Sequence, residues 1–278
     1  MSDLPELIPE VLPGDDKPQS LWAHVGELRE RLLRAIMSVV LASMVTYVLR
    51  FRLWELATRP LNHSLAGRLP LGASPFAYTD LAEPFMALVT LSFWAAVFLV
   101  SPYVFYQLWA FVKPALRPRE RNMATVFVVV TSSCFILGAL FAYFFMFGTL
   151  ADLLMQEAVS AGLRPNLKPT EYLNLFLYTV VGCGIAFEAP VLFYFLARFG
   201  IVNSRAMRKY WREATIAILF VSGFCTPGDV VATMIVFGVV LSLLYYVSVL
   251  VVWLVERSTG YVPPPEADDE DEEEADEF

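Results

Sequence analysis

Residues 181–190 read VGCGIAFEAP and place a carboxylate, Glu188, inside an apolar run that extends from Tyr172 to Ala197. An ionisable side chain within hydrocarbon costs about 2.5–3.5 kcal/mol on insertion scales, so such a residue is expected to face a partner or a water-filled cavity. Pro190 lacks an N–H group and therefore frees the carbonyl of Ala186, one helical turn earlier. The run is predicted to be a membrane span with an acid and a kink at its centre.

The composition is that of a polytopic membrane protein. The chain has 278 residues, of which 57% are hydrophobic and only 17% charged, and its mean hydropathy is +0.57. Ten of the 28 acidic residues lie in residues 266–278, so without them the 20 basic residues face 18 acidic ones. The first 20 residues contain no apolar core, and the first span is expected to act as the insertion signal.

Six apolar runs predict six transmembrane helices. An amphipathic segment capped by Ser20 leads into the first, and the loops at 51–84 and 148–171 are expected to end in helix starts at Thr79-Asp80 and Thr170. The domain limits are a disordered segment at 1–19, a membrane domain at 20–257 and a disordered acidic tail at 258–278. The runs are 35–49, 85–112, 123–147, 172–197, 214–225 and 230–255.

The fifth run is too short to span a bilayer alone. Its 12 residues extend about 18 Å, against a hydrocarbon core of about 30 Å. Either the helix begins near Asn203-Ser204, with Tyr210 and Trp211 in the interface, or the bilayer thins locally. Basic residues number 14 on one side of the predicted spans and 6 on the other, which places both termini in the cytoplasm.

Enzyme signatures are absent from the sequence. No HExxH, GxSxG, Walker or Rossmann pattern occurs, and the two histidines, His24 and His63, fall on opposite sides of the predicted membrane. The three cysteines lie in apolar runs at unrelated spacings, which suggests neither disulfides nor a metal site. We therefore expect no catalysis, no cofactor and no metal.

Two cytoplasmic carboxylates are embedded in basic residues, Glu27 in ELRER and Glu120 in RPRER. One interpretation is local charge balance, because Glu27 and Arg31 lie four residues apart on one helix face. The other is a site for a cationic ligand, since a carboxylate pairs bidentately with guanidinium. In that case the neighbouring arginines Arg29, Arg31, Arg119 and Arg121 would hold the acids in place.

Four stretches, in this order and spacing, resemble the TatC family of twin-arginine translocases over about residues 20–257. They are HVGELRERLLRAI, SPYVFYQLWAFVKPALRPRER, GIAFEAPVLFYFLARFGIV and TPGD. The resemblance implies a cup-shaped, six-span receptor for twin-arginine signal peptides of folded proteins, in the inner membrane of a bacterium. It further implies single-span TatB and TatA partners along the fifth and sixth spans, transport driven by the proton-motive force, contact with lipid, self-association and no nucleic acid.

The resemblance also assigns residues. Those at the signal-peptide surface are Glu27, Arg29, Arg31, Phe111, Glu120 and Arg121. Polar residues expected to contact a partner within the membrane are Glu188, Thr226, Asp229 and Thr233, and structural positions are Pro60, Asp80, Pro102 and Pro190. Departures from the family pattern include TPGD where TPPD is common and Thr233 where some members have Gln.

Several features have a second interpretation. Pro102 is expected to form a packing kink, the aromatic residues after it a membrane belt, and the acidic tail a solvated segment that could attract basic partners. The alternative function is an ion-coupled secondary transporter that uses Glu188 as its proton site. No sequence repeat between the two halves supports that alternative.

Overall fold

A computed structural model describes residues 21–65, 74–113, 124–163, 166–225 and 231–259, most of them helical. Five helical segments in these ranges are long and apolar enough to cross a membrane: Val25–Val48, Glu83–Val112, Thr125–Ser160, Pro169–Arg198 and Met234–Ser258. The predicted all-helical class is confirmed for the described residues. The fifth predicted span corresponds to α10 (Trp211–Cys225), whose 15 residues do not qualify by length, so six crossings stay a prediction.

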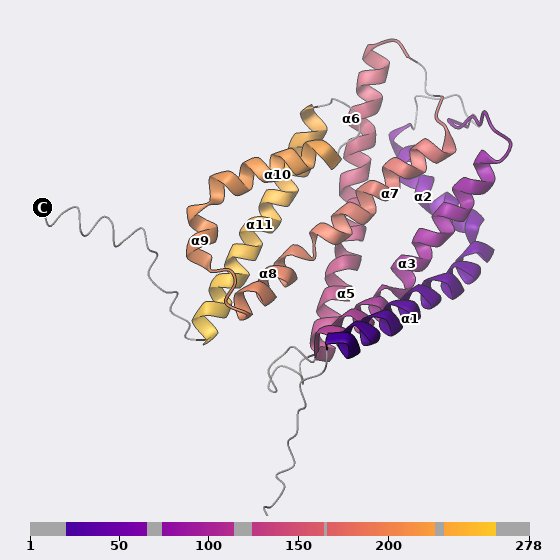
Figure 1. Cartoon of the computed structure of the whole chain (residues 1–278). Coiled ribbons are helices and arrows are strands. Elements are labelled where there is room, and N and C mark those ends of the chain that lie inside the picture. Colours follow the sequence, from indigo (N-terminus) through magenta and orange to yellow (C-terminus); the bar gives the residue numbers. More distant parts are fainter. Residues whose placement is uncertain (1–20, 66–73, 114–123, 164–165, 226–230, 260–278) are drawn as a thin grey trace, which may run out of the picture.

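Helices α1 (Leu21–Val48) and α3 (Glu83–Val112) form an antiparallel pair along one side of the molecule (Figure 1). The Thr46 hydroxyl donates a hydrogen bond of 2.7 Å to the carbonyl of Ser92, which fixes the register of the two helices. Ala35 and Ala96 are buried in the same pair. Small residues allow this close approach, which helices in hydrocarbon need because lipid tails are as apolar as their side chains.

A long helical column stands in the middle of the molecule (Figure 1) and consists of α5 (Ala124–Phe141), the π-helical turn η2 (Ala142–Met146) and α6 (Phe147–Ser160). Helix α7 (Pro169–Ala186) packs closely against α5. A Cβ atom on Gly138 would lie 2.7 Å from the carbonyl oxygen of Cys183, and one on Gly184 would lie 2.9 Å from the Phe135 ring. Gly138 is therefore required by a backbone contact, whereas a larger residue at Gly184 would have to displace the Phe135 ring.

Two apolar cores hold α3, the central column and α7 together with two further helices. The larger joins α2 (Arg50–Ser64), the first half of α3, the central column and α7, around the buried Leu173 and Phe147. The smaller joins the second half of α3, α5 and α8 (Ala189–Arg198), where Phe195 contacts Trp109 with ring centroids 4.3 Å apart. The smaller core positions α8 relative to the rest of the bundle.

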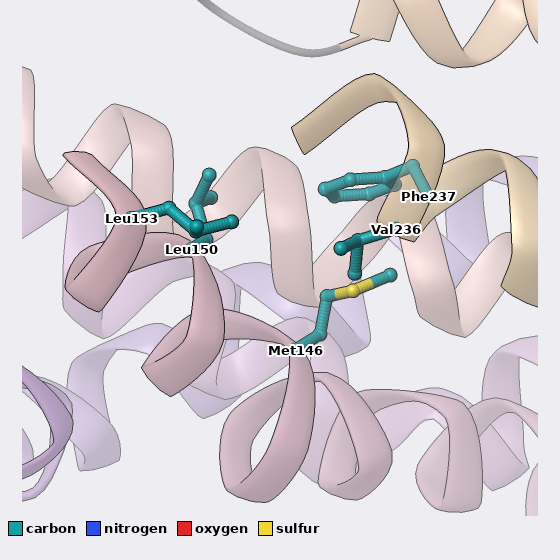
Figure 2. A pocket seen from close by; sticks show the side chains of 5 residues that line it. All are labelled: Met146, Leu150, Leu153, Val236 and Phe237. Atoms are coloured by element: carbon teal, nitrogen blue, oxygen red, sulfur yellow. The ribbon is translucent and has the colours of Figure 1, made fainter. Parts of the chain in front are cut away.

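The other half of the molecule contains α8, α9 (Ser204–Lys209), α10 and α11 (Val231–Thr259). It meets the central column where α11 approaches α6. Figure 2 shows the five apolar side chains that meet at this contact, which leaves no room for a water molecule: Met146, Leu150, Leu153, Val236 and Phe237. Phe237 is buried there and belongs to the larger core.

The predicted loop at 51–84 is wrong in its first part, because residues 50–64 form the helix α2. Pro60 lies inside this helix. The predicted helix start at Thr79-Asp80 is three residues too early, because α3 begins at Glu83 with Ala82 as its N-cap. Asp80 lies in the turn before it, where its Oδ1 accepts a hydrogen bond of 3.0 Å from the Ala82 N–H. Pro102 lies inside α3 without ending it.

The predicted loop at 148–171 is also wrong in its first part, because the third span continues as α6 to Ser160. The column of 36 residues from Thr125 is about 54 Å long, well beyond the hydrocarbon core of about 30 Å. Helix α7 begins at Pro169, so Thr170 lies in its first turn and is not its N-cap, which is Lys168.

The expected early start of the fifth helical region is confirmed. The Asn203 side chain caps α9 by accepting a hydrogen bond of 2.6 Å from the Ala206 N–H. Tyr210 separates α9 from α10. Ser20, the predicted cap of the first helix, and most residues of the two predicted tails lie outside the described residues.

Candidate functional site

The first half of α1 carries a half-buried ion pair on the face that packs against α3. The Arg31 guanidinium donates to Glu27 Oε1 through Nε at 2.9 Å and through Nη2 at 2.5 Å. The side chains of Arg31 and Glu27 are only 23% and 28% exposed. Both hydrogen bonds end on Oε1, so this pair leaves Oε2 of Glu27 unused.

A second ion pair with the same spacing lies beside it and provides a comparison. Arg34 Nη2 contacts Glu30 Oε1 at 2.5 Å, but these side chains are 54% and 64% exposed. Arg29 is also exposed. The predicted local pairing of Glu27 with Arg31 is thus confirmed, and burial against α3 distinguishes it from the Glu30–Arg34 pair.

The last turns of α3 lie beside this pair. Thr46 of α1 contacts Ser92 of α3. Glu27 lies 19 residues before Thr46 in α1, and Phe111 lies 19 residues after Ser92 in α3. Because the two helices are antiparallel, both residues lie about 28 Å from that contact in the same direction. Phe111 is half-buried. By the same register Gln107 lies level with Arg31.

Gln107 is a polar residue that the sequence interpretation missed. It is buried, and its Oε1 accepts no hydrogen bond within the described part of the chain. A buried acceptor without a donor is costly, which makes it a candidate contact for a ligand or water. No local motif marks Gln107, because its position depends on the register between α1 and α3.

Glu120 and Arg121 lie outside the described residues. The segment that contains them leaves α3 after Lys113 and re-enters at Ala124, the first residue of α5. Both of these ends lie near the start of α1 (Figure 1). The chain on either side of Glu120 therefore reaches the same end of the bundle as Glu27.

The predicted break at Glu188 is confirmed. Helix α7 ends at Ala186 and α8 begins at Ala189, with Pro190 in its first turn. The N–H of Glu188 donates to the carbonyl of Ile185, three residues earlier, at 3.0 Å. The chain therefore forms a 3₁₀-type turn between the two helices. Glu188 is half-buried, and its Oε1 is buried with no hydrogen-bond donor among the described residues.

The other intramembrane residues predicted from the resemblance are not tested. Thr226 and Asp229, and the side chain of Thr233, lie outside the described residues. Whether they approach Glu188 stays a prediction.

Pro60 has a structural role that the sequence did not reveal. The carbonyl four residues earlier, that of Leu56, has lost its helical donor. The hydroxyl of Tyr143 in η2 donates to this carbonyl at 2.9 Å, and the hydroxyl of Tyr172 in α7 donates to the neighbouring carbonyl of Ala57 at 2.7 Å. These two hydrogen bonds fasten α2 to the column and to α7.

The family model described as Sec-independent protein translocase protein (TatC) matches residues 23–239. The chain belongs to the TatC family. Two relatives, both called Sec-independent protein translocase protein TatC, are 31% identical: one from Deinococcus radiodurans, over 83% of this chain and 84% of its own length, and one from Helicobacter pylori strain J99, over 92% and 95%.

Solved structures agree with this TatC assignment. A crystal structure titled Twin Arginine Translocase Receptor- TatC superposes with a TM-score of 0.72 and 25% identity, covering 84% of this chain and 99% of that one. A second TatC crystal structure, in DDM, gives a TM-score of 0.69 and 26% identity.

Membership of the TatC family gives the protein a role in protein transport and, with its five apolar helical segments, makes it a multi-pass membrane protein. Among the described residues no group of three or more His, Cys, Asp or Glu side chains is placed to hold a metal ion.

Proposed function

We propose that this TatC protein is the receptor subunit of a twin-arginine translocase and that Glu27 and Glu120 bind the two arginines of the signal peptide. The observation that carries the proposal is the half-buried Glu27, fixed by Arg31 through Oε1 alone. Oriented in this way, the carboxylate keeps Oε2 for an incoming guanidinium. Glu120 belongs to the segment whose two ends lie at the same end of the bundle.

The surroundings of Glu27 suit a guanidinium better than an ammonium. A guanidinium is planar and pairs with a carboxylate in a fixed geometry, whereas a lysine ammonium is a compact point charge. Phe111, level with Glu27, offers a half-buried ring to the residues that follow the arginines. Arg29, Arg31 and Arg121 hold the acids and repel cations of the wrong geometry.

We further propose the membrane arrangement. Helices α9 and α10 form a short fifth span, which makes six spans in a cup-shaped bundle within the inner membrane of a bacterium. The 15 residues of α10 extend about 22 Å, so its ends lie in the interface or the bilayer thins around it. The basic residues of the predicted loops place both termini in the cytoplasm.

Single-span TatA and TatB subunits are the proposed partners along α10 and α11, together with further copies of this chain, and the proton-motive force drives transport. Exposed apolar side chains on both helices support this arrangement: Ile216, Phe220, Val239 and Leu243. No nucleic acid is expected to take part.

A peptide-binding measurement tests the receptor proposal. A fluorescent twin-arginine signal peptide is titrated against the purified chain in nanodiscs, beside a peptide in which both arginines are lysines. We expect Glu27→Ala or Glu120→Ala to weaken binding of the first peptide about tenfold or more, because each removes a charge-assisted hydrogen bond worth about 1.5–3 kcal/mol. The lysine peptide should bind weakly to all variants.

Glu30→Ala is the matched control, since it removes an acid of the same helix from an ion pair of the same spacing. Binding should be unchanged in this variant. Full binding by the double variant Glu27→Ala, Glu120→Ala would refute the proposed site, and equal binding of the arginine and lysine peptides would refute recognition by geometry.

Glu188 is proposed as a polar contact at the centre of the cup, for a partner helix or for the inserted signal peptide. Its Oε1, which is buried and has no hydrogen-bond donor in the described part of the chain, supports this role. Measuring protein export in Glu188→Gln and Glu188→Leu separates the need for a charge from the need for a polar group. Normal export in Glu188→Gln would mean that the charge is dispensable. Normal export in Glu188→Leu would mean that a polar side chain is dispensable as well.

The same unpaired oxygen favours the second candidate function, an ion-coupled secondary transporter with Glu188 as its proton site. Liposomes that contain this chain alone decide between the two. Substrate-dependent proton flux that is lost in Glu188→Gln would support the transporter and would contradict a receptor without transport activity of its own.

A further inference from the structure

A hollow lies where α9 and α10 meet α11, away from Glu27 and from Glu188. Its volume is about 370 Å³, and one side of it is open. The break at Tyr210 turns α10 away from α9 and so leaves space against α11. Its lining residues combine apolar, aromatic and basic side chains: Met207, Arg208, Trp211, Tyr245, Tyr246 and Val249.

The α9 wall of this hollow is fixed to α11 at two points. Glu256, near the end of α11, accepts hydrogen bonds from the N–H of Ser204, at 2.6 Å, and from its hydroxyl. The Tyr245 hydroxyl donates to the carbonyl of Met207 at 2.6 Å. A helix of six residues is held in this way at its first and fourth residues, so the hollow has a rigid wall.

Arg208 lies on this wall with one edge of its guanidinium already engaged. Nε donates to the Ser204 carbonyl at 3.2 Å, and Nη2 lies 3.5 Å from the Ser204 hydroxyl. Nη1 takes part in neither contact. An oriented guanidinium at the edge of a hollow is the group that proteins use for phosphate, because its N–H donors match phosphate oxygens.

The surrounding charge is positive. Residues 204–213 contain four basic side chains and one acid, Glu213. Helix α11 adds the base Arg257 and the acid Glu256, whose carboxylate binds Ser204, so basic side chains outnumber acidic ones five to two. The guanidinium of Arg212 lies 5.6 Å from the centre of the Trp211 ring, and that of Arg257 lies 5.5 Å from that of Trp253. Tryptophan and arginine side by side at the end of apolar helices are typical of the depth at which lipid headgroups lie.

We propose that this hollow binds an anionic phospholipid, with the headgroup phosphate against Arg208 and the first part of an acyl chain against Trp211, Tyr246 and Val249. The proposal rests on the cytoplasmic placement of this end of the bundle and is independent of signal-peptide binding. Basic residues near an anionic leaflet are attracted to its headgroups. A neutral lipid with the same chains would lack that attraction.

Thermal unfolding of the full chain in detergent micelles tests the site, with dioleoyl phosphatidylglycerol and dioleoyl phosphatidylcholine as the two probes. We expect phosphatidylglycerol alone to raise the Tm. In Arg208→Gln the concentration of phosphatidylglycerol that gives half of this rise should increase about tenfold, as expected for one charge-assisted contact. Arg208→Lys keeps the positive charge but lacks the paired N–H donors of a guanidinium. Its half-rise concentration should lie between those of the unchanged chain and Arg208→Gln.

Arg205→Gln is the matched control, because Arg205 is exposed on the same short helix and does not line the hollow. The phosphatidylglycerol concentration that gives half of the Tm rise should change less than about twofold in this variant, as expected for a charge outside the site. An equal effect of the two glutamine variants would overturn the proposal and leave only diffuse attraction. Equal stabilisation by phosphatidylcholine or by soluble glycerol phosphate would overturn it too.

The chain's own acidic segment, residues 266–278, is the competing occupant. It is tested in the full-length chain with its ten acids replaced by amides. The proposal expects the response to phosphatidylglycerol to be kept in both forms. A response that appears only after the replacement would overturn it, because the acidic segment would then fill the hollow.

Discussion

Pro60 and Pro190 each remove a backbone N–H from a helical segment, yet α2 continues through the first while the chain divides into α7 and α8 at the second. At Pro60 the freed carbonyl of Leu56 receives the Tyr143 hydroxyl from a neighbouring helix. At Pro190 the chain turns through Phe187 and Glu188, and packing then directs α8. The neighbouring helices therefore decide whether a helix continues through a proline or ends at it.

Packing of α8 is expected to have the largest effect. Phe195 lies between Trp109 and Phe127, with ring centroids 4.3 and 4.7 Å away. Phe195→Ala should lower the free energy of unfolding by about 2–3 kcal/mol, below the range for soluble cores because hydrocarbon also solvates the ring. Thermal unfolding in dodecyl maltoside measures it.

Leu192→Ala, on the exposed side of the same helix, is the control for this variant and should cost less than about 1 kcal/mol. Equal losses in the two variants would mean that the smaller core does not direct α8.

The hydroxyl that compensates for Pro60 gives the second effect. Tyr143→Phe removes the donor to the Leu56 carbonyl and should cost about 1 kcal/mol, a typical value for a hydrogen bond between helices in a membrane. In a Pro60→Ala background the N–H of residue 60 returns to that carbonyl. The same tyrosine substitution should then cost close to nothing, as measured by a double-mutant cycle.

Tyr172→Phe is the comparison for this cycle, since its acceptor is the carbonyl of Ala57 and not the one that Pro60 frees. Its cost should be similar in both backgrounds. A cost of Tyr143→Phe that does not depend on residue 60 would contradict the compensation.

Pro190→Ala should have the smallest effect. Pro190 lies in the first turn of α8, where a backbone N–H has no helical acceptor in any case. The substitution should cost less than about 1 kcal/mol, mainly through the greater freedom of the unfolded chain. If Pro190→Ala destabilises the protein more than Phe195→Ala, the proline itself directs α8.

The apolar spans were predictable because length and hydropathy are local properties. Helix α2 was missed because Arg50, Arg52 and Arg59 make it polar and Pro60 is typical of a loop, although Leu53, Ala57 and Leu61 follow helical spacing. Helix α6 was missed because a span was expected to end at the width of the bilayer. Its polar residues, such as Asp152 and Glu157, mark the part that extends beyond hydrocarbon.

The candidate site was predictable to a similar degree. The pairing of Glu27 with Arg31 follows from a spacing of four residues on one helix. Its partial burial does not, because it depends on how α1 packs against α3. The same holds for Gln107 and for the Tyr143 hydroxyl, whose neighbours come from helices far away in the sequence. Local patterns identify such residues only after the register between helices is known.

The π-helical turn η2 changes the phase of the central column. One extra residue within a helix rotates everything after it by about 100° relative to an uninterrupted α-helix. The face that α5 presents to α7 through Gly138 therefore differs from the face that α6 presents to α11 through Leu150. The column therefore packs on α7 along α5 and η2, while the rotated face of α6 reaches α2 and α11 as well.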